Sequence, residues 1–140
     1  IICIRYAIVA KWAEQRGLAF TNYTNLSAQP EVYQAIREEV LKVNESLPDA
    51  QKISKFILLY KELDADDGEL TRTRKVRRGV VAEKYGDIIE TIYSDDPKVD
   101  VDTVITYQDG TKTRIQTSLV IETLIEHEPT LVDSEQRRIA

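Results

Sequence analysis

Two blocks of opposite charge lie side by side near the middle of the sequence. The first spans residues 62–69 and contains five acids: Glu62, Asp64, Asp66, Asp67 and Glu69. The second spans residues 72–78 and contains five bases in seven positions: Arg72, Arg74, Lys75, Arg77 and Arg78. Two interpretations are open, namely solvated charges that pair loosely with each other or a basic loop that binds an anion. Composition alone favours the first.

Other residues suited to chemistry are scarce. Cys3 is the single cysteine and lies in an apolar run over residues 1–4, where a buried thiol without a catalytic role is expected. His127 is the single histidine, and its glutamate and proline neighbours indicate a surface loop. One cysteine and one histidine cannot form a metal-ligand spacing or a thiol–imidazole pair within this chain. No metal site is predicted.

The composition bounds the class of protein. The chain has 140 residues, of which 42% are hydrophobic and 31% charged, so it suits one compact domain. Its net charge of -5 argues against a surface shaped as a whole for nucleic acid. Apolar runs such as Phe56–Tyr60 are far shorter than the roughly 20 residues that span a bilayer.

The start of the chain shows no secretory-signal pattern, so a cytoplasmic location is expected, with peripheral contact to a membrane left open. Because the sequence contains no Met, we expect it to be an excerpt of a longer protein.

Apolar spacing predicts two helices before the charged blocks. The first is indicated by Ile8, Val9, Trp12 and Ala13, with Gly17 as a natural stop. The second begins at Pro30 and ends before Pro48, since its apolar positions repeat at steps of three and four: Val32, Ile36, Val40, Val43 and Leu47. The intervening residues 18–29 are polar and turn-rich.

Two short strands and a third helix complete the surroundings of the charged blocks. Residues 1–5 and 53–60 are apolar and β-branched enough for strands. Residues 80–92 carry an apolar stripe with helical spacing, and this helix begins where the basic block ends.

The last part of the chain changes to a period of two. Apolar residues alternate with polar ones over residues 101–107 and 115–121, and Asp109-Gly110 between them is a strong turn signal. A β-hairpin is therefore predicted, and from Glu122 onward we expect either a loosely held acidic tail or a segment that packs on a part of the protein outside these residues. Together the elements predict an α+β fold, a small sheet flanked by helices with an added C-terminal β-hairpin.

The charged blocks also carry a family resemblance. Residues 64–78 (DADDGELTRTRKVRR), followed by VVAEKY at residues 80–85, resemble the end of long-chain fatty-acid–CoA ligases, which belong to the adenylate-forming superfamily. Upstream, the helix containing KWAEQRG and the helix over residues 30–47 occur in the same order as in that family. The resemblance covers roughly residues 1–93, so we expect a lid domain there. Residues 94–126 are then an appended hairpin that packs on the same domain, and 127–140 an acidic tail.

The resemblance implies a reaction and a site. In this family a fatty acid and ATP form an acyl-adenylate and diphosphate with Mg²⁺, and the acyl group then passes to the thiol of coenzyme A. Lys75 matches the lysine that the mobile C-terminal domain delivers for adenylation, and Arg74 and Arg78 are weaker candidates for substrate binding. A compact ammonium is suited to this step because it offsets repulsion between the carboxylate and the α-phosphate.

The motif departs from the pattern common in the superfamily. Arg72 stands where a proline is common, and Arg74 precedes Lys75 where many members have glycine. This agrees with the shorter motif of the long-chain subgroup, but the alignment leaves Arg74 and Arg77 as competitors of Lys75 for the catalytic role.

Most of the family's site has no counterpart in these residues. The phosphate loop, the nucleotide and acyl pockets, the hinge and the pantetheine tunnel would all lie before Ile1. The expected partner is therefore the N-terminal adenylation domain of the same chain, and the 140 residues alone are expected to be inactive. The alternative is a module that binds an anion or nucleic acid through residues 72–78, although these lack aromatic side chains for base stacking.

Overall fold

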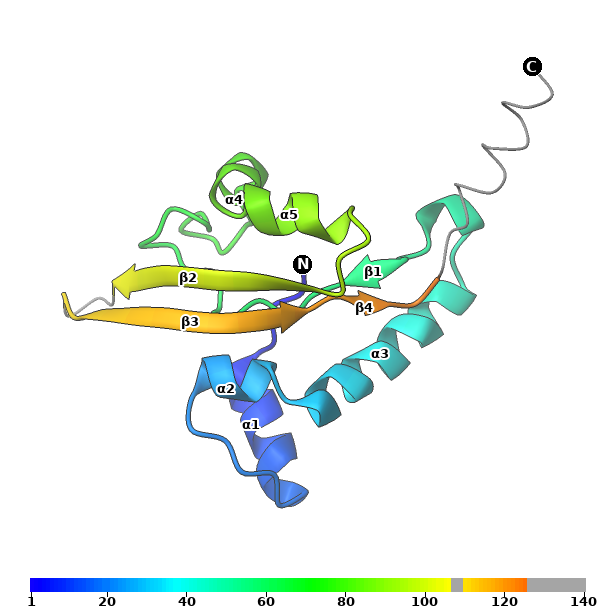
Figure 1. The fold of residues 1–140 in the computed structure, drawn as a ribbon, viewed down its shortest axis with the longest axis horizontal. Coiled ribbons are helices and arrows are strands. Elements are labelled where there is room, and N and C mark those ends of the chain that lie inside the picture. The colour runs from blue at the N-terminus through cyan, green and yellow to red at the C-terminus, as the bar shows by residue number, and fades with distance from the viewer. Residues whose placement is uncertain (107–109, 126–140) are drawn as a thin grey trace.

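The computed structural model describes residues 1–106 and 110–125, and it has the predicted α+β fold (Figure 1). His127, the expected tail over residues 127–140 and Asp109 of the predicted turn lie outside the described residues. The helices are α1 (Tyr6–Gln15), α2 (Tyr23–Ser27), α3 (Pro30–Glu45), the 3-10 turn η1 (Asp49–Gln51), α4 (Arg78–Lys84) and α5 (Gly86–Ile92). The strands are β1 (Lys55–Phe56), β2 (Lys98–Thr106), β3 (Lys112–Val120) and β4 (Glu122–Thr123).

A fully apolar segment over residues 56–60 runs through the centre of the molecule. Phe56 and Leu58 join one core cluster, and Ile57 and Leu59 join the other, because successive side chains of an extended chain point to opposite faces. The predicted buried strand over residues 53–60 is too long: burial begins only at Phe56, since Ile53 is exposed, and regular pairing covers only β1. The Leu58 amide instead donates to the Tyr33 hydroxyl at 3.1 Å.

The N-terminal segment does not form the predicted strand over residues 1–5. It makes one parallel bridge, Ile2 to Leu58, in which the Ile2 amide donates to the Ile57 carbonyl and the Leu59 amide donates to the Ile2 carbonyl. Pairing ends there because the chain enters α1 at Tyr6.

Helices α1, α2 and α3 cover one face of this central segment (Figure 1). The predicted stop of α1 is confirmed, since Gly17 follows the helix with a φ of +70°. Helix α2 was not predicted. It begins after Asn22, whose side chain accepts a hydrogen bond from the Asn25 amide at 2.8 Å.

Helix α3 confirms the predicted stripe except at its C-terminal end. Val32 and Val40 are buried, but Val43 is 51% exposed. Asn44 is buried instead, where its side chain donates to the Ile53 carbonyl and accepts from the Ile53 amide, each at 2.9 Å.

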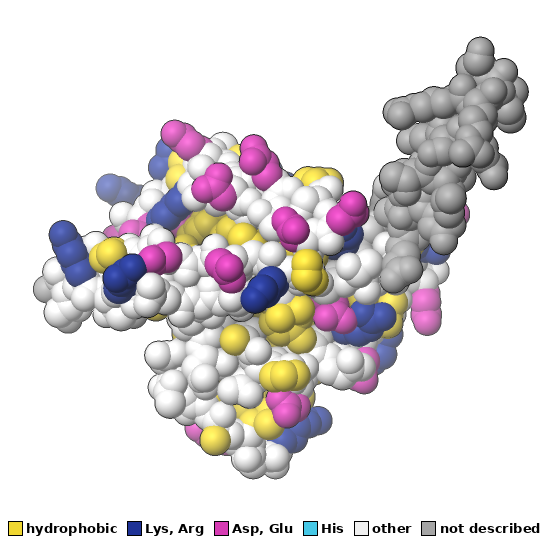
Figure 2. All heavy atoms as spheres, in the orientation of Figure 1, with side chains coloured by type: hydrophobic (Ala, Val, Ile, Leu, Met, Phe, Trp, Pro, Cys, Tyr) yellow, Lys and Arg dark blue, Asp and Glu magenta, His cyan; other side chains and the backbone are white. Residues whose placement is uncertain are grey.

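The other face is covered by α4, α5 and the hairpin of β2 and β3 (Figure 1). One continuous helix was predicted over residues 80–92, whereas two seven-residue helices meet at Tyr85. The hairpin is confirmed, and its register pairs Val101 with Thr117 and Thr103 with Ile115. Its outer face is mainly polar, with Val104 and Val120 also exposed, and acidic and basic side chains are mixed over this side of the molecule (Figure 2).

The expectation of a loose tail from Glu122 is wrong for the first residues. After β3 the chain changes partner, and β4 pairs antiparallel with β1. Arg37 of α3 holds this strand, since its Nη1 donates to Glu122 Oε1 at 2.6 Å and to the Thr123 carbonyl at 2.9 Å. No helix in the described part of the chain is long and apolar enough to cross a membrane.

Candidate functional site

The five bases lie on a tight turn, residues 71–77, and on the first residue of α4; we call residues 71–77 the basic loop. The Thr71 amide donates to the Lys75 carbonyl at 2.8 Å, and the Lys75 amide donates to Thr71 Oγ1 at 3.0 Å. An antiparallel bridge between Leu70 and Val76 closes the turn. The loop is therefore a small hairpin-like projection with a fixed backbone.

Arg74 adopts a left-handed backbone conformation. Its φ is +63°, the only positive φ of a non-glycine residue in the described part of the chain. Its amide donates to the Thr71 carbonyl at 2.9 Å, so the conformation is part of the turn. This is the position where glycine is common in the superfamily motif, and the loop retains the glycine-like conformation although the residue is arginine.

The Lys75 side chain is exposed, and the residue lies opposite Thr71 on the returning arm of the basic loop. The ion pairs that Asp67 and Glu69 of the acidic block form do not involve Lys75 or the four arginines around it. For these two acids, therefore, the partners are not the bases with which composition favoured loose pairing. The structure gives no contact that brings the side chains of Arg74, Lys75 and Arg78 together, and Arg78 opens α4 beside the loop.

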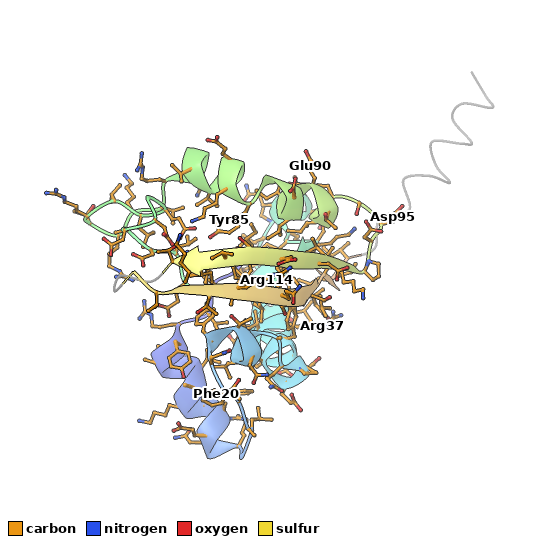
Figure 3. All side chains as sticks on the ribbon, turned by 60° about the vertical axis from the view of Figure 1, so that its left-hand side comes forward. Phe20, Arg37, Tyr85, Glu90, Asp95 and Arg114 are labelled. Atoms are coloured by element: carbon orange, nitrogen blue, oxygen red, sulfur yellow. The ribbon has the colours of Figure 1, made fainter. Side chains whose placement is uncertain are left out.

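The acidic block pairs with lysines outside the basic loop. Asp67 accepts from Lys61 at 3.1 Å and lies 3.8 Å from Lys84 Nζ. Glu69, with none of its surface exposed, accepts from Lys61 and from the Tyr85 hydroxyl, and its Oε2 lies 3.2 Å from Lys84 Nζ. Tyr85 lies between the hairpin on one side and helices α4 and α5 on the other (Figure 3).

The environment sets the protonation state of this buried pair. Burial by itself raises the pKa of the Glu69 carboxyl, but hydrogen bonds from Lys61, Tyr85 and the Asp64 amide outweigh burial and lower it below its ordinary value. Burial and the bond to Glu69 raise the pKa of the Tyr85 hydroxyl. At neutral pH the site therefore holds a buried carboxylate and a protonated phenol.

Glu69 and Lys61 are the residues that sequence reasoning missed. Glu69 is one of five acids in eight positions, and a single sequence does not reveal which of them is buried. Lys61 precedes that block and has no motif of its own.

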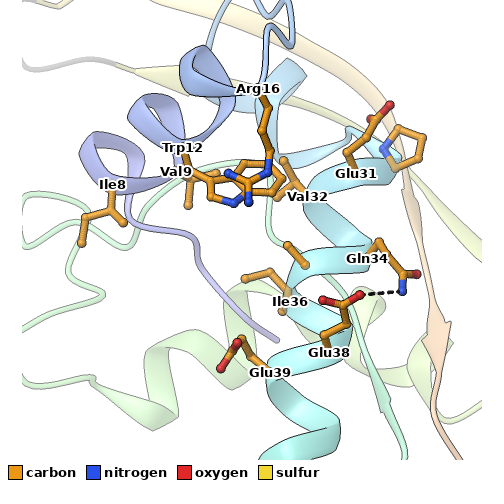
Figure 4. A pocket seen from close by; sticks show the side chains of 12 residues that line it. Ile8, Val9, Trp12, Arg16, Glu31, Val32, Gln34, Ile36, Glu38 and Glu39 are labelled. Atoms are coloured by element: carbon orange, nitrogen blue, oxygen red, sulfur yellow. Dashed lines mark hydrogen bonds between the residues drawn. The ribbon is translucent and has the colours of Figure 1, made fainter.

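Two other features lie away from the basic loop. A groove of about 950 Å³ runs between α1 and α3, lined by Ile8, Trp12 and Ile36 with acidic Glu38 and Glu39 at its edge (Figure 4). Cys3 is half-buried, and burial raises the pKa of its thiol. The described residues contain no cluster of histidine, cysteine and carboxylate side chains suited to a metal ion.

Comparison with known proteins gives the context of this loop. The family model "AMP-binding enzyme C-terminal domain" matches residues 17–97, more than half of the chain. Long-chain-fatty-acid–CoA ligase ACSBG2 of Gallus gallus is 45% identical over 65 residues, which are 46% of this chain and 8% of that protein.

Two further relatives carry similar names. Long-chain-fatty-acid–CoA ligase heimdall of Drosophila melanogaster is 38% identical over 69 residues, 49% of this chain and 10% of that protein. Long-chain-fatty-acid–CoA ligase FadD15 of Mycobacterium tuberculosis is 40% identical over 70 residues, 50% of this chain and 12% of that protein. The matches thus span about a tenth of each of these relatives. No solved structure matches the chain significantly.

Proposed function

The chain belongs to the family of AMP-binding enzyme C-terminal domains, and from this we propose that it is the C-terminal domain of a long-chain fatty-acid–CoA ligase with Lys75 as its adenylation lysine. The observation that carries the proposal is the basic loop: a hydrogen-bonded turn presents exposed cations, and the neighbouring acids Asp67 and Glu69 pair with Lys61 and Lys84 instead of with them. Family membership supports the choice of anion, namely the phosphate of ATP and the carboxylate of the fatty acid.

In the proposed reaction, a fatty-acid carboxylate attacks the α-phosphorus of ATP to form an acyl-adenylate and diphosphate. The Lys75 ammonium lies between the two anions and offsets their repulsion and the charge that develops during attack. The acyl group then passes to the thiol of coenzyme A. Since a lid movement can deliver and withdraw the loop, Lys75 acts in the first half-reaction and not in the second.

The basic loop fits a phosphate-bearing substrate, because its side chains are cationic and exposed. Arg74 and Arg78 flank Lys75 in the sequence and supply further positive charge for ATP or coenzyme A. We assign no Mg²⁺ ligand to the described residues, since no group of carboxylates gathers there. The pockets for ATP and the fatty acid belong, in this proposal, to an N-terminal adenylation domain.

The test is Lys75→Ala in the complete ligase, with the two half-reactions assayed separately. Adenylation, measured as exchange of labelled diphosphate into ATP, is expected to fall by about 100-fold or more, corresponding to about 3 kcal/mol of lost transition-state stabilisation. Transfer from preformed acyl-adenylate to coenzyme A is expected to change little.

Arg72→Ala is the matched control, since it removes one exposed charge from the same loop. Equal loss in both half-reactions of Lys75→Ala, or the same loss with Arg72→Ala, would show that Lys75 has no specific role.

A further inference from the structure

Glu69 is a buried anion directly beneath the basic loop. None of its surface is exposed, and both carboxylate oxygens are occupied. Oε1 accepts from Lys61 and from the Asp64 amide, the latter at 3.0 Å, while Oε2 accepts from the Tyr85 hydroxyl and lies 3.2 Å from Lys84 Nζ. A buried carboxylate is costly unless it is paired in this way, so its position is strongly specified.

The backbone of Glu69 joins both ends of the basic loop. The loop leaves Glu69 through Leu70 and returns at Arg77, whose amide donates to the Glu69 carbonyl at 2.9 Å. On the other side, the Glu69 amide donates to the Asp64 carbonyl at 3.0 Å. Helix α4 starts one residue after Arg77, and its C-terminal Lys84 and Tyr85 reach back to the Glu69 carboxylate. The loop and α4 thus both converge on one residue.

Next to the basic loop, two carboxylates are neutralised by two lysines that do not belong to the loop. The network contains two carboxylates, Asp67 and Glu69, and two ammonium groups, Lys61 and Lys84. Lys61 is well buried, with 11% of its side chain exposed. Because Lys61 and Lys84 pair with Asp67 and Glu69, these two acids do not neutralise the five bases of residues 72–78.

We propose that Glu69 is a positioning residue, which anchors the basic loop on α4 so that Lys75 is aimed at the reacting phosphate. The inference rests on the proposed function of Lys75. In this inference the buried network of Glu69, Lys61, Lys84 and Tyr85 acts on adenylation indirectly. It positions Lys75, and none of its side chains contacts the substrate.

Glu69→Gln is the most specific perturbation because it keeps the size and shape of the side chain. A glutamine has one oxygen and one amino group, so either Lys61 or Lys84 must face a donor instead of an acceptor. The network then holds one carboxylate for two ammonium groups, and the anchor of the loop is weakened. Glu83→Gln is the matched control, since Glu83 is an exposed residue of α4.

The experiment uses four forms of the complete ligase: unchanged, Glu69→Gln, Lys75→Ala and the double variant. We expect Glu69→Gln to lower adenylation by about 10-fold to 100-fold, as misplacement of a catalytic group does, and to leave transfer from preformed acyl-adenylate within about 2-fold. In the Lys75→Ala background the same change should have no further effect, because Glu69 acts through Lys75. Glu83→Gln should alter neither half-reaction.

The outcomes separate this inference from the function on which it rests. If Lys75→Ala leaves adenylation intact, the proposed function itself is wrong. If Lys75→Ala abolishes adenylation but the effect of Glu69→Gln is absent, equal in both half-reactions or additive with Lys75→Ala, the proposed function stands and the positioning role is overturned. Should Glu69→Gln fail to fold, Tyr85→Phe retains the buried ring and removes one hydrogen bond from Oε2. A smaller loss confined to adenylation is then expected, and an unchanged adenylation rate would overturn the role.

Discussion

Replacing Arg74 with glycine separates the backbone conformation of the basic loop from its charge. Arg74 has a φ of +63°, where a side chain is strained and glycine is not. Its neighbour Arg72 lies in the same turn, is also exposed and has no positive φ. Arg72→Gly is therefore a control that removes the same charge and adds the same chain flexibility without relieving strain.

The expected magnitudes follow from two opposing effects. A left-handed conformation costs a non-glycine residue about 1–2 kcal/mol, which Arg74→Gly recovers. A new glycine raises the entropy of the unfolded chain and costs about 0.5–1 kcal/mol at either position. Arg74→Gly is thus expected to be neutral or slightly stabilising, whereas Arg72→Gly destabilises, and the two variants should differ by about 1–2 kcal/mol in free energy of unfolding.

Urea unfolding of the 140-residue chain measures this difference. With an m-value of about 2 kcal/mol per molar urea, the midpoints of the two variants should differ by about 0.5–1 M at unchanged m. Equal midpoints would refute the reasoning, because the strain at Arg74 would then contribute nothing to stability. In the complete ligase, Arg74→Gly with normal adenylation would also remove Arg74 as a competitor of Lys75.

Two further measurements test the core and the buried carboxylate. Leu119→Ala, at a buried position of β3, should lower the free energy of unfolding by about 2–5 kcal/mol. Val120→Ala, on the exposed face of the same strand, should lower it by well under half as much. Similar losses for the two variants in urea unfolding would mean that the hairpin is not packed on α4 and α5. Because the pKa of Glu69 is lowered by Lys61 and Tyr85, its contribution to stability is present above the ordinary carboxyl pKa and is lost as the pH falls through the lowered value. As the pH is lowered from 7 to 3, the Tm should therefore fall more steeply for the unchanged chain than for Glu69→Gln. If the Tm of the two forms falls in parallel, the pKa of Glu69 is not lowered by folding.

Local sequence patterns predicted the elements whose side chains face one way over a long stretch. The stripe of α3 and the alternation of β2 and β3 each report which face is buried, so the type of these elements followed from spacing alone. Short elements were missed because they contain too few residues to show a periodic pattern. Helix α2 has five residues, and its start depends on the Asn22 cap in a polar segment. The break between α4 and α5 escaped detection because Tyr85 fits the helical stripe equally well.

In the candidate site, too, local features could be predicted from the sequence and contacts between distant residues could not. The motif around Lys75 is contiguous, so the sequence identified the basic loop and its family resemblance. The left-handed conformation of Arg74 could be suspected only from the glycine common at that position. The pairing of the charges could not be predicted, since Asp67 and Glu69 lie next to the bases in the sequence but pair with Lys61 and Lys84 in space.

The sequence by itself therefore determined the α+β class, the main helices, the hairpin and the cationic loop that carries Lys75. Only the tertiary structure decided that Glu69 is the buried acid, that Lys61 and Lys84 neutralise it, and that the chain after β3 returns to pair with β1. The physical reason is that burial and ion pairing depend on residues far apart in the chain, as in the contact between Arg37 and Glu122, whereas periodicity is a local property.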